Sequence, residues 1–143
     1  MQYTLLPFAA LALTACTSAP PTPAPTPAMP FPSSYACDAS TNGYCYGYGT
    51  YYVAQKRSVP RNWGNASSWY AHAQRDGYEV GTIPKKGAIA CTSAGGYGQV
   101  AIVEEILEDG ATIRISEMHG KGGWNVVSTR EAPAAAFTYI YIF

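Results

Sequence analysis

Few residues in this chain could carry out covalent chemistry: four cysteines and two histidines among 143 residues. A cysteine thiolate attacks a carbonyl carbon when a helix N-terminus lowers its pKa and a histidine takes up its proton. A third polar group must then orient that histidine. Cys45, Cys91 and His119 have side chains of the right types. Whether they form such a centre depends on the elements that position them.

Two short helices are expected ahead of a sheet. Residues 49–57 contain good helix formers, and residues 66–75 form a second helical stretch that Asn65 is placed to cap. Strand patterns follow at residues 88–91, 99–106, 111–118, 126–129 and 139–143. Asp109-Gly110 predicts a hairpin turn between two of these strands. The order predicts an α+β fold, with two or three short N-terminal helices packed on a bent antiparallel sheet of about five or six strands.

Six blocks of sequence within residues 46–142 resemble the CHAP domain, the cysteine- and histidine-dependent amidohydrolase/peptidase module of bacterial cell-wall hydrolases and phage lysins. The blocks are residues 48–54, 60–66, 77–81, 84–90, 95–101 and 115–118. The resemblance implies a papain-like fold with a cleft for a peptidoglycan stem peptide. It covers essentially the whole expected domain.

The same resemblance implies that the catalytic pair is missing. In the block that the family reads as G-Q-C-T-W-Y, the nucleophile position holds Gly49, and in the G-H-V-A block the base position holds Gln99. Glu117 keeps the place of the orienting carboxylate, while His119 replaces an asparagine of the family. Glycine has no side chain to attack with, and glutamine takes up no proton at physiological pH. The sequence therefore predicts a pseudoenzyme with no catalytic residues.

The remaining cysteines leave two alternatives open. Cys45 paired with His119, or Cys91 near the old cleft, would give a relocated nucleophile. In an exported chain, by contrast, Cys37 and Cys45 flank a turn and predict a local disulfide, with Cys91 buried and inert. Pairing of Cys91 with either of the other two also stays open.

Aromatic residues gather before the first expected helix. Tyr44, Tyr46 and Tyr48 exceed what a core of this size needs and predict a binding surface. Tyr52, Trp63 and Trp69 are favoured as core residues. The full set of expected binding positions, Trp63 included, is Tyr44, Tyr46, Tyr48, Gly49, Trp63, Tyr97, Gln99, Glu117, His119 and Trp124.

Two polar features are expected to be structural. His72 is predicted to be a surface or half-buried residue, and the acidic residues at 104, 105, 108 and 109 are predicted to form a solvated hairpin face. No metal site and no cofactor are expected.

The N-terminal part has a different composition. Residues 1–36 carry no Asp, Glu, Lys or Arg, and residues 5–13 form an apolar run typical of a signal peptide. The sequence Leu-Thr-Ala-Cys ending at Cys16 resembles the lipobox of bacterial lipoproteins, which implies that Cys16 is acylated, and Thr17 suits sorting to the outer membrane. An ordinary cleaved signal peptide is the alternative, since the segment before the apolar run lacks Lys and Arg.

Three regions are therefore predicted: a signal peptide at 1–15, a lipidated and Pro-rich tether at 16–34, and a CHAP-like domain at 35–143. Seven of the eleven prolines lie between Pro20 and Pro32, and such a segment forms an extended spacer.

The balance of charges limits the classes of function that we expect for this chain. Nine Lys and Arg against nine Asp and Glu argue against a nucleic-acid binder. The leading hypothesis is a catalytically degenerate envelope lipoprotein that binds peptidoglycan peptide or a protein partner. The alternatives are an active amidase or endopeptidase with a relocated cysteine, and an inhibitor or exclusion lipoprotein.

Overall fold

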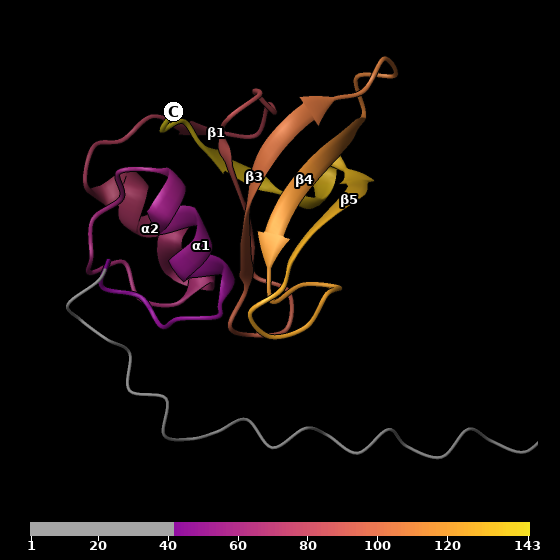
Figure 1. Cartoon of the computed structure of the whole chain (residues 1–143). Coiled ribbons are helices and arrows are strands. Elements are labelled where there is room, and N and C mark those ends of the chain that lie inside the picture. Colours follow the sequence, from indigo (N-terminus) through magenta and orange to yellow (C-terminus); the bar gives the residue numbers. More distant parts are fainter. Residues whose placement is uncertain (1–41) are drawn as a thin grey trace, which may run out of the picture. The chain divides into compact units, whose positions relative to one another are not determined.

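The computed structural model describes residues 42–143 (Figure 1). The predicted leader and tether, with Cys16 and Cys37, lie outside the described residues, and the predicted domain boundaries remain predictions. Within the described part of the chain, no helix has the length and apolar character needed to cross a bilayer.

Both predicted helices are present. Helix α1 is Gly49–Lys56 and helix α2 is Ala66–Arg75. Helix α1 buries Tyr51, Tyr52 and Val53 against the sheet, and it ends where the Arg57 N–H bonds the carbonyl of Val53. The aromatic start of α1 is therefore part of the core.

The N-terminus of α2 is satisfied by a partner that the sequence did not indicate. Asn65 occupies the N-cap position, but its side chain makes no capping hydrogen bond. The Ser67 N–H instead donates to the Tyr97 carbonyl at 2.9 Å. Because an unpaired backbone N–H at a helix start is unfavourable, the loop that carries Tyr97 completes this helix.

The strands form one six-stranded antiparallel sheet with the order β1-β6-β2-β3-β4-β5. Their bounds are β1 Val80–Gly81, β2 Ile89–Thr92, β3 Gln99–Ile106, β4 Thr112–Met118, β5 Val127–Pro133 and β6 Thr138–Ile140. The α+β prediction is confirmed: Figure 1 shows α1 and α2 together on one side of the strands.

Two of the predicted strands differ from their predicted ranges by more than one residue. Strand β5 continues to Pro133 because it pairs with β4 along its whole length, from Thr112 opposite Pro133 to Met118 opposite Val127. Strand β6 is Thr138–Ile140, displaced from the predicted 139–143, and the two-residue β1 was not predicted.

The two faces of the sheet carry separate hydrophobic clusters. Val100 and Ile102 pack with residues of α1 and α2, whereas Ala101 and Val103 pack on the opposite face. This alternation follows from the two-residue period of a strand. The sheet is therefore buried on both faces near its centre, and the start of β3 is held firmly beside α1.

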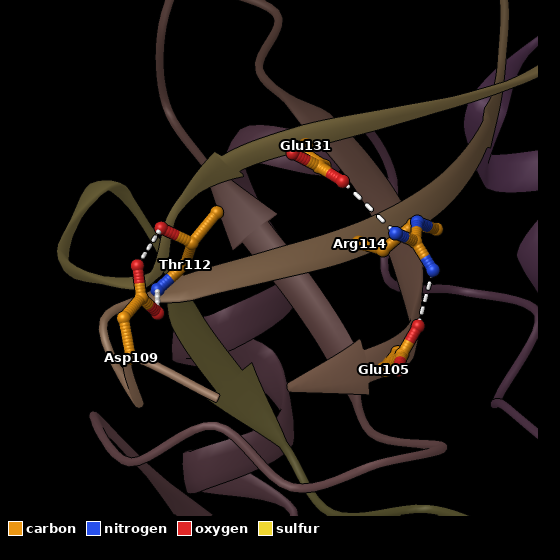
Figure 2. Close-up of polar contacts among 5 residues, drawn as sticks. All are labelled: Glu105, Asp109, Thr112, Arg114 and Glu131. Carbon is orange, nitrogen blue, oxygen red and sulfur yellow. Dashed lines mark hydrogen bonds and ion pairs between the residues drawn. The ribbon is translucent and has the colours of Figure 1, made fainter. Parts of the chain in front are cut away.

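The hairpin between β3 and β4 is closed by polar contacts (Figure 2). Both carboxylate oxygens of Asp109 accept hydrogen bonds from Thr112, one from its N–H at 2.8 Å and one from its hydroxyl at 2.7 Å. Arg114 bridges Glu105 and Glu131 across three strands. The acidic hairpin face is thus partly neutralised by Arg114. Within residues 42–143, no group of three His, Cys, Asp or Glu side chains is arranged to hold a metal.

Candidate functional site

The two positions that the resemblance singled out face each other. Gly49 is the first residue of α1 and is buried, and Gln99 is the first residue of β3. A Cβ atom placed on Gly49 would lie 2.7 Å from Gln99 Oε1 and 2.9 Å from the carbonyl oxygen of Val100. Real Cβ atoms do not approach other atoms this closely. The space in which a nucleophile side chain would begin is therefore filled by the Gln99 carboxamide.

The Gln99 side chain is held by a hydrogen bond from its amide nitrogen. Its Nε2 donates to the carbonyl of Met118, the last residue of β4, at 3.0 Å. Its Oε1 lies beside the N-terminus of α1, where the helix dipole favours negative charge. A partially negative amide oxygen thus lies where a thiolate would be stabilised, and this amide offers neither a nucleophile nor a base.

Glu117 is present at the expected position, and its carboxylate is paired with an arginine. Its side chain is almost fully buried, and its two oxygens meet Arg130 of β5, with Nε to Oε1 at 2.7 Å and Nη2 to Oε2 at 3.3 Å. Paired oxygens of this kind compensate a buried charge well. The carboxylate is thereby held in an ion pair inside the sheet.

His119 lies against the start of α1. Its backbone adopts the left-handed conformation, with φ of 60°, and its ring meets that of Tyr48 edge to face at 4.9 Å between centroids. Because Tyr48 is the N-cap residue of α1, His119 belongs to the same cluster as Gly49 and Gln99. The structure therefore brings four of the predicted binding positions together.

Two exposed aromatic residues lie next to this cluster. Tyr46 and Trp124, which we call the aromatic shelf, have ring centroids 5.9 Å apart at an interplanar angle of 76°. Tyr46 is 50% exposed and Trp124 is 38% exposed. The Asn125 N–H donates to the carbonyl of Gly47 at 3.0 Å, which ties the β4–β5 loop to the segment before α1. Tyr46 and Trp124 therefore form a continuous surface beside Gly49.

Two predicted binding positions are buried. Tyr44 is 5% exposed, since its ring packs on Trp69 at 5.0 Å and its hydroxyl donates to the carbonyl of Pro60. Burial raises the pKa of Tyr44 to about 12. Trp63 is fully buried, and its Nε1 donates to Asp76 at 2.8 Å. Both side chains belong to the core, which for Trp63 confirms the favoured expectation, and the burial of Tyr44 differs from the exposure expected for it.

The structure confirms the burial expected for Tyr52, Trp69 and His72. Tyr52 and Trp69 are buried as expected. His72 is half-buried, with Nδ1 2.8 Å from the carbonyl oxygen of Trp63. Tyr97 is 77% exposed on the β2–β3 loop, so its role as a binding residue stays a prediction.

The described cysteines do not form a relocated centre. Cys91 is a free thiol that lies buried in the core, and burial raises its pKa well above the ordinary value. Such a thiol is protonated and inert at neutral pH. Cys45 is disulfide-bonded. Its predicted partner, Cys37, lies outside the described residues, so that pairing stays a prediction.

A shallow hollow of about 330 Å³ lies elsewhere on the domain. It is lined by α2, the end of β2 and the segment before β6, including Ser67, Tyr70 and Thr138. Within the described residues, none of the predicted binding positions lines it, but Cys91, one of the two alternative nucleophiles, does. It is therefore separate from the cluster around Gly49.

Arg130 and Gly47 contact residues of the candidate site, and the sequence did not indicate either of them. Arg130 meets Glu117 only because β5 pairs with β4 in a particular register, with Glu117 opposite Ser128. Gly47 matters because a Cβ there would lie 2.4 Å from Trp124 Nε1. Contacts between residues this far apart in sequence leave no signal in the sequence of a single chain.

The helices, the bent sheet and the cluster at the start of α1 define a papain-like domain of the kind that the six blocks implied. The chain belongs to the CHAP family, whose model, described as CHAP domain, matches residues 37–119.

The chain is similar to the staphylococcal secretory antigen SsaA of Staphylococcus epidermidis, with 43% identity over 113 residues, 76% of this chain and 44% of that protein. Secretory antigen ssaA2 of Staphylococcus aureus is 41% identical over 105 residues, 70% of this chain and 39% of that protein. The chain thus spans less than half the length of these curated relatives. The crystal structure of an N-acetylmuramoyl-L-alanine amidase from Staphylococcus aureus matches with a TM-score of 0.61 and 35% identity, over 68% of this chain and 31% of that one.

Proposed function

We propose that this chain is an exported protein of the cell envelope that binds peptidoglycan through a CHAP fold, without covalent catalysis at the family's reactive centre. The observation that carries the proposal is the contact between Gly49 and Gln99. The carboxamide fills the position of a nucleophile side chain, with Oε1 at 2.7 Å from a Cβ at residue 49. Neither the nucleophile nor the base of the family's catalytic pair is therefore present at this contact.

The surroundings of that contact support loss of catalysis. Glu117 is paired with Arg130, and the buried Cys91 thiol has a raised pKa. Removal of a nucleophile from a catalytic triad leaves only the slow reaction that binding and oxyanion stabilisation support. Cys91 is 4% exposed and lines the hollow beside α2, which Gly49, Gln99 and His119 do not line. This separation favours the non-catalytic hypothesis over a relocated nucleophile at Cys91.

The surface around the contact supports a retained binding function. Two aromatic pairs, Tyr46 with Trp124 and Tyr48 with His119, lie at the segment that leads into the filled centre. Relatives named as secretory antigens and a similar structure named as an N-acetylmuramoyl-L-alanine amidase point to the bacterial wall as the place of action. The balanced charge of the chain argues against a nucleic acid as the ligand.

The leader completes the proposal. Residues 1–15 act as a signal peptide, Cys16 carries the lipid, and residues 16–34 hold the CHAP domain of residues 35–143 away from the membrane. At about 3.1 Å per residue, a spacer in the extended polyproline conformation reaches roughly 60 Å over this length. Thr17 favours sorting to the outer membrane. A disulfide joins Cys37 to Cys45 near the start of the CHAP domain.

Zymography and a sacculus pulldown test the proposal together. The wild-type chain is expected to sediment with purified sacculi and to leave no clearing zone in a wall-containing gel, and Gly49→Ala is expected to do the same. Clearing that disappears in Cys45→Ala or Cys91→Ala would show a relocated nucleophile. Sedimentation only in the presence of another envelope protein would show an inhibitor or exclusion factor instead.

A further inference from the structure

We infer that the aromatic shelf of Tyr46 and Trp124 binds one pyranose ring of the glycan strand, so that the chain recognises the sugar part of peptidoglycan and not only its peptides. The inference rests on the proposed function and assigns a ligand class to one surface of it. With the centre at Gly49 filled, the shelf is the adjoining surface that still presents aromatic rings to solvent.

The shelf is held in place before any ligand arrives. Trp124 packs directly over Gly47, where any side chain would collide with the indole. The hydrogen bond from Asn125 to the Gly47 carbonyl fixes the loop next to it, and Tyr46 is supported from below by the ring of Tyr51 at 5.1 Å. A rigid surface loses little conformational entropy on binding, which favours small ligands.

The charge around the shelf selects among ligands. Residues 42–49 carry no Asp, Glu, Lys or Arg, and in residues 119–126 the only such residue is Lys121, which is exposed. Aromatic sites for ammonium groups hold the cation against the negative ring faces, and a neighbouring lysine repels such a cation. A neutral ligand fits better. The C–H groups on the face of a sugar ring carry a partial positive charge that suits an aromatic face.

The size of the surface also favours a sugar. From their exposed fractions, Tyr46 and Trp124 with the neighbouring Val126 and Val127 present on the order of 350 Å², taking a full side-chain area of about 150–250 Å² for the aromatic residues. A stable protein interface needs about 800 Å² from each partner. The two rings, 5.9 Å apart, instead match the dimensions of one sugar unit.

Tryptophan fluorescence of the full chain tests the inference, because Trp63 and Trp69 are fully buried and Trp124 is the partly exposed one of the three tryptophans. Titration with chitotetraose, a peptide-free chain of N-acetylglucosamine, is expected to shift the emission and to protect Trp124 from acrylamide. Calorimetry measures the affinity of each variant for chitotetraose. Trp124→Ala is expected to weaken this binding at least tenfold, and Trp124→Phe is expected to retain part of the affinity. Ile83→Ala, an exposed apolar residue outside the shelf, is the matched control and should bind as the wild type does.

The outcomes separate this inference from the proposed function. Sacculus binding that persists in a chain with no affinity for chitotetraose would overturn the glycan site and leave the proposed function standing. Loss of sacculus binding in the wild type would overturn both. Protection of Trp124 by a free stem peptide but not by chitotetraose would assign the shelf to the peptide and would also overturn the inference. Near-ultraviolet circular dichroism of each variant establishes that it is folded.

Discussion

Gly49 of α1 and Gln99 of β3 are in direct contact, so that any side chain at residue 49 would begin within 2.7 Å of the Gln99 amide oxygen. The two departures from the family pattern are therefore compatible with each other in space. A thiol cannot return to residue 49 without moving Gln99, and Gln99 is held by its bond to the Met118 carbonyl. The two positions are expected to behave as one unit in mutagenesis.

A double-mutant cycle measures this coupling. Alanine normally stabilises a helix relative to glycine by about 1 kcal/mol, but Gly49→Ala is expected to destabilise the domain by about 1–2 kcal/mol, because overpacking outweighs that gain. Gln99→Ala should cost about 1 kcal/mol through its lost hydrogen bond. In the Gln99→Ala background the alanine at residue 49 should cost about 1 kcal/mol less. Urea denaturation followed by circular dichroism gives the four free energies, and strict additivity would refute the contact.

Restoring the catalytic pair tests whether the cleft survives. Gly49→Cys combined with Gln99→His places a thiol at the N-terminus of α1 and an imidazole at the start of β3. A positioned general base contributes about 10²–10⁴-fold, so the double variant should hydrolyse purified wall at least 100-fold faster than Gly49→Cys alone. Release of soluble wall fragments is the measurement. A folded double variant with no more activity than the single one would show that the cleft no longer admits the substrate.

The Glu117–Arg130 pair is expected to stabilise the fold. Removal of one partner of a buried ion pair typically costs 3–5 kcal/mol, and because Arg130 is partly exposed we expect about 2–3 kcal/mol for Arg130→Met. Glu117→Gln in the same background should recover most of this loss, since no charge is then buried alone. Denaturation midpoints of the three variants test this. If the double variant lost as much stability as Arg130→Met alone, the loss would come from the packing of the Arg130 side chain and not from an unpaired charge on Glu117.

Tyr44 makes the stability sensitive to alkaline pH. Burial raises its pKa to about 12 in the folded protein, whereas an unfolded tyrosine titrates near pH 10. The unfolded chain therefore loses this proton first. The contribution of Tyr44 to stability is complete below about pH 10 and falls as the pH rises through 12. Tyr44→Phe should show a smaller drop in unfolding midpoint between pH 9 and pH 11 than the wild type. Equal drops in both proteins would contradict the assignment.

The sequence was informative where a pattern is local. The helix formers of α1, the alternation in β3 and the Asp109-Gly110 turn each depend on neighbouring residues, and all three are present in the structure. The positions of Gly49 and Gln99 came from their place in the family blocks. Their contact came from the fold alone, because it joins residues that lie fifty positions apart.

The errors also have a physical reason. Tyr44 and Tyr46 have the same side chain and lie two residues apart, yet Tyr44 is buried on Trp69 while Tyr46 is half exposed. Composition cannot distinguish two tyrosines whose surroundings are set by distant residues. Arg130 was missed for the same reason, since its partner Glu117 is known only once β4 and β5 are placed in register.

The bond between the Ser67 N–H and the Tyr97 carbonyl has a consequence for how this protein can diversify. Helix α2 depends on the backbone of residue 97 and not on its side chain, and that side chain projects into solvent. Mutation can therefore change residue 97 without disturbing the helix beneath it. The β2–β3 loop is thus a position at which ligand preference can evolve, or be engineered, while the folded domain stays intact.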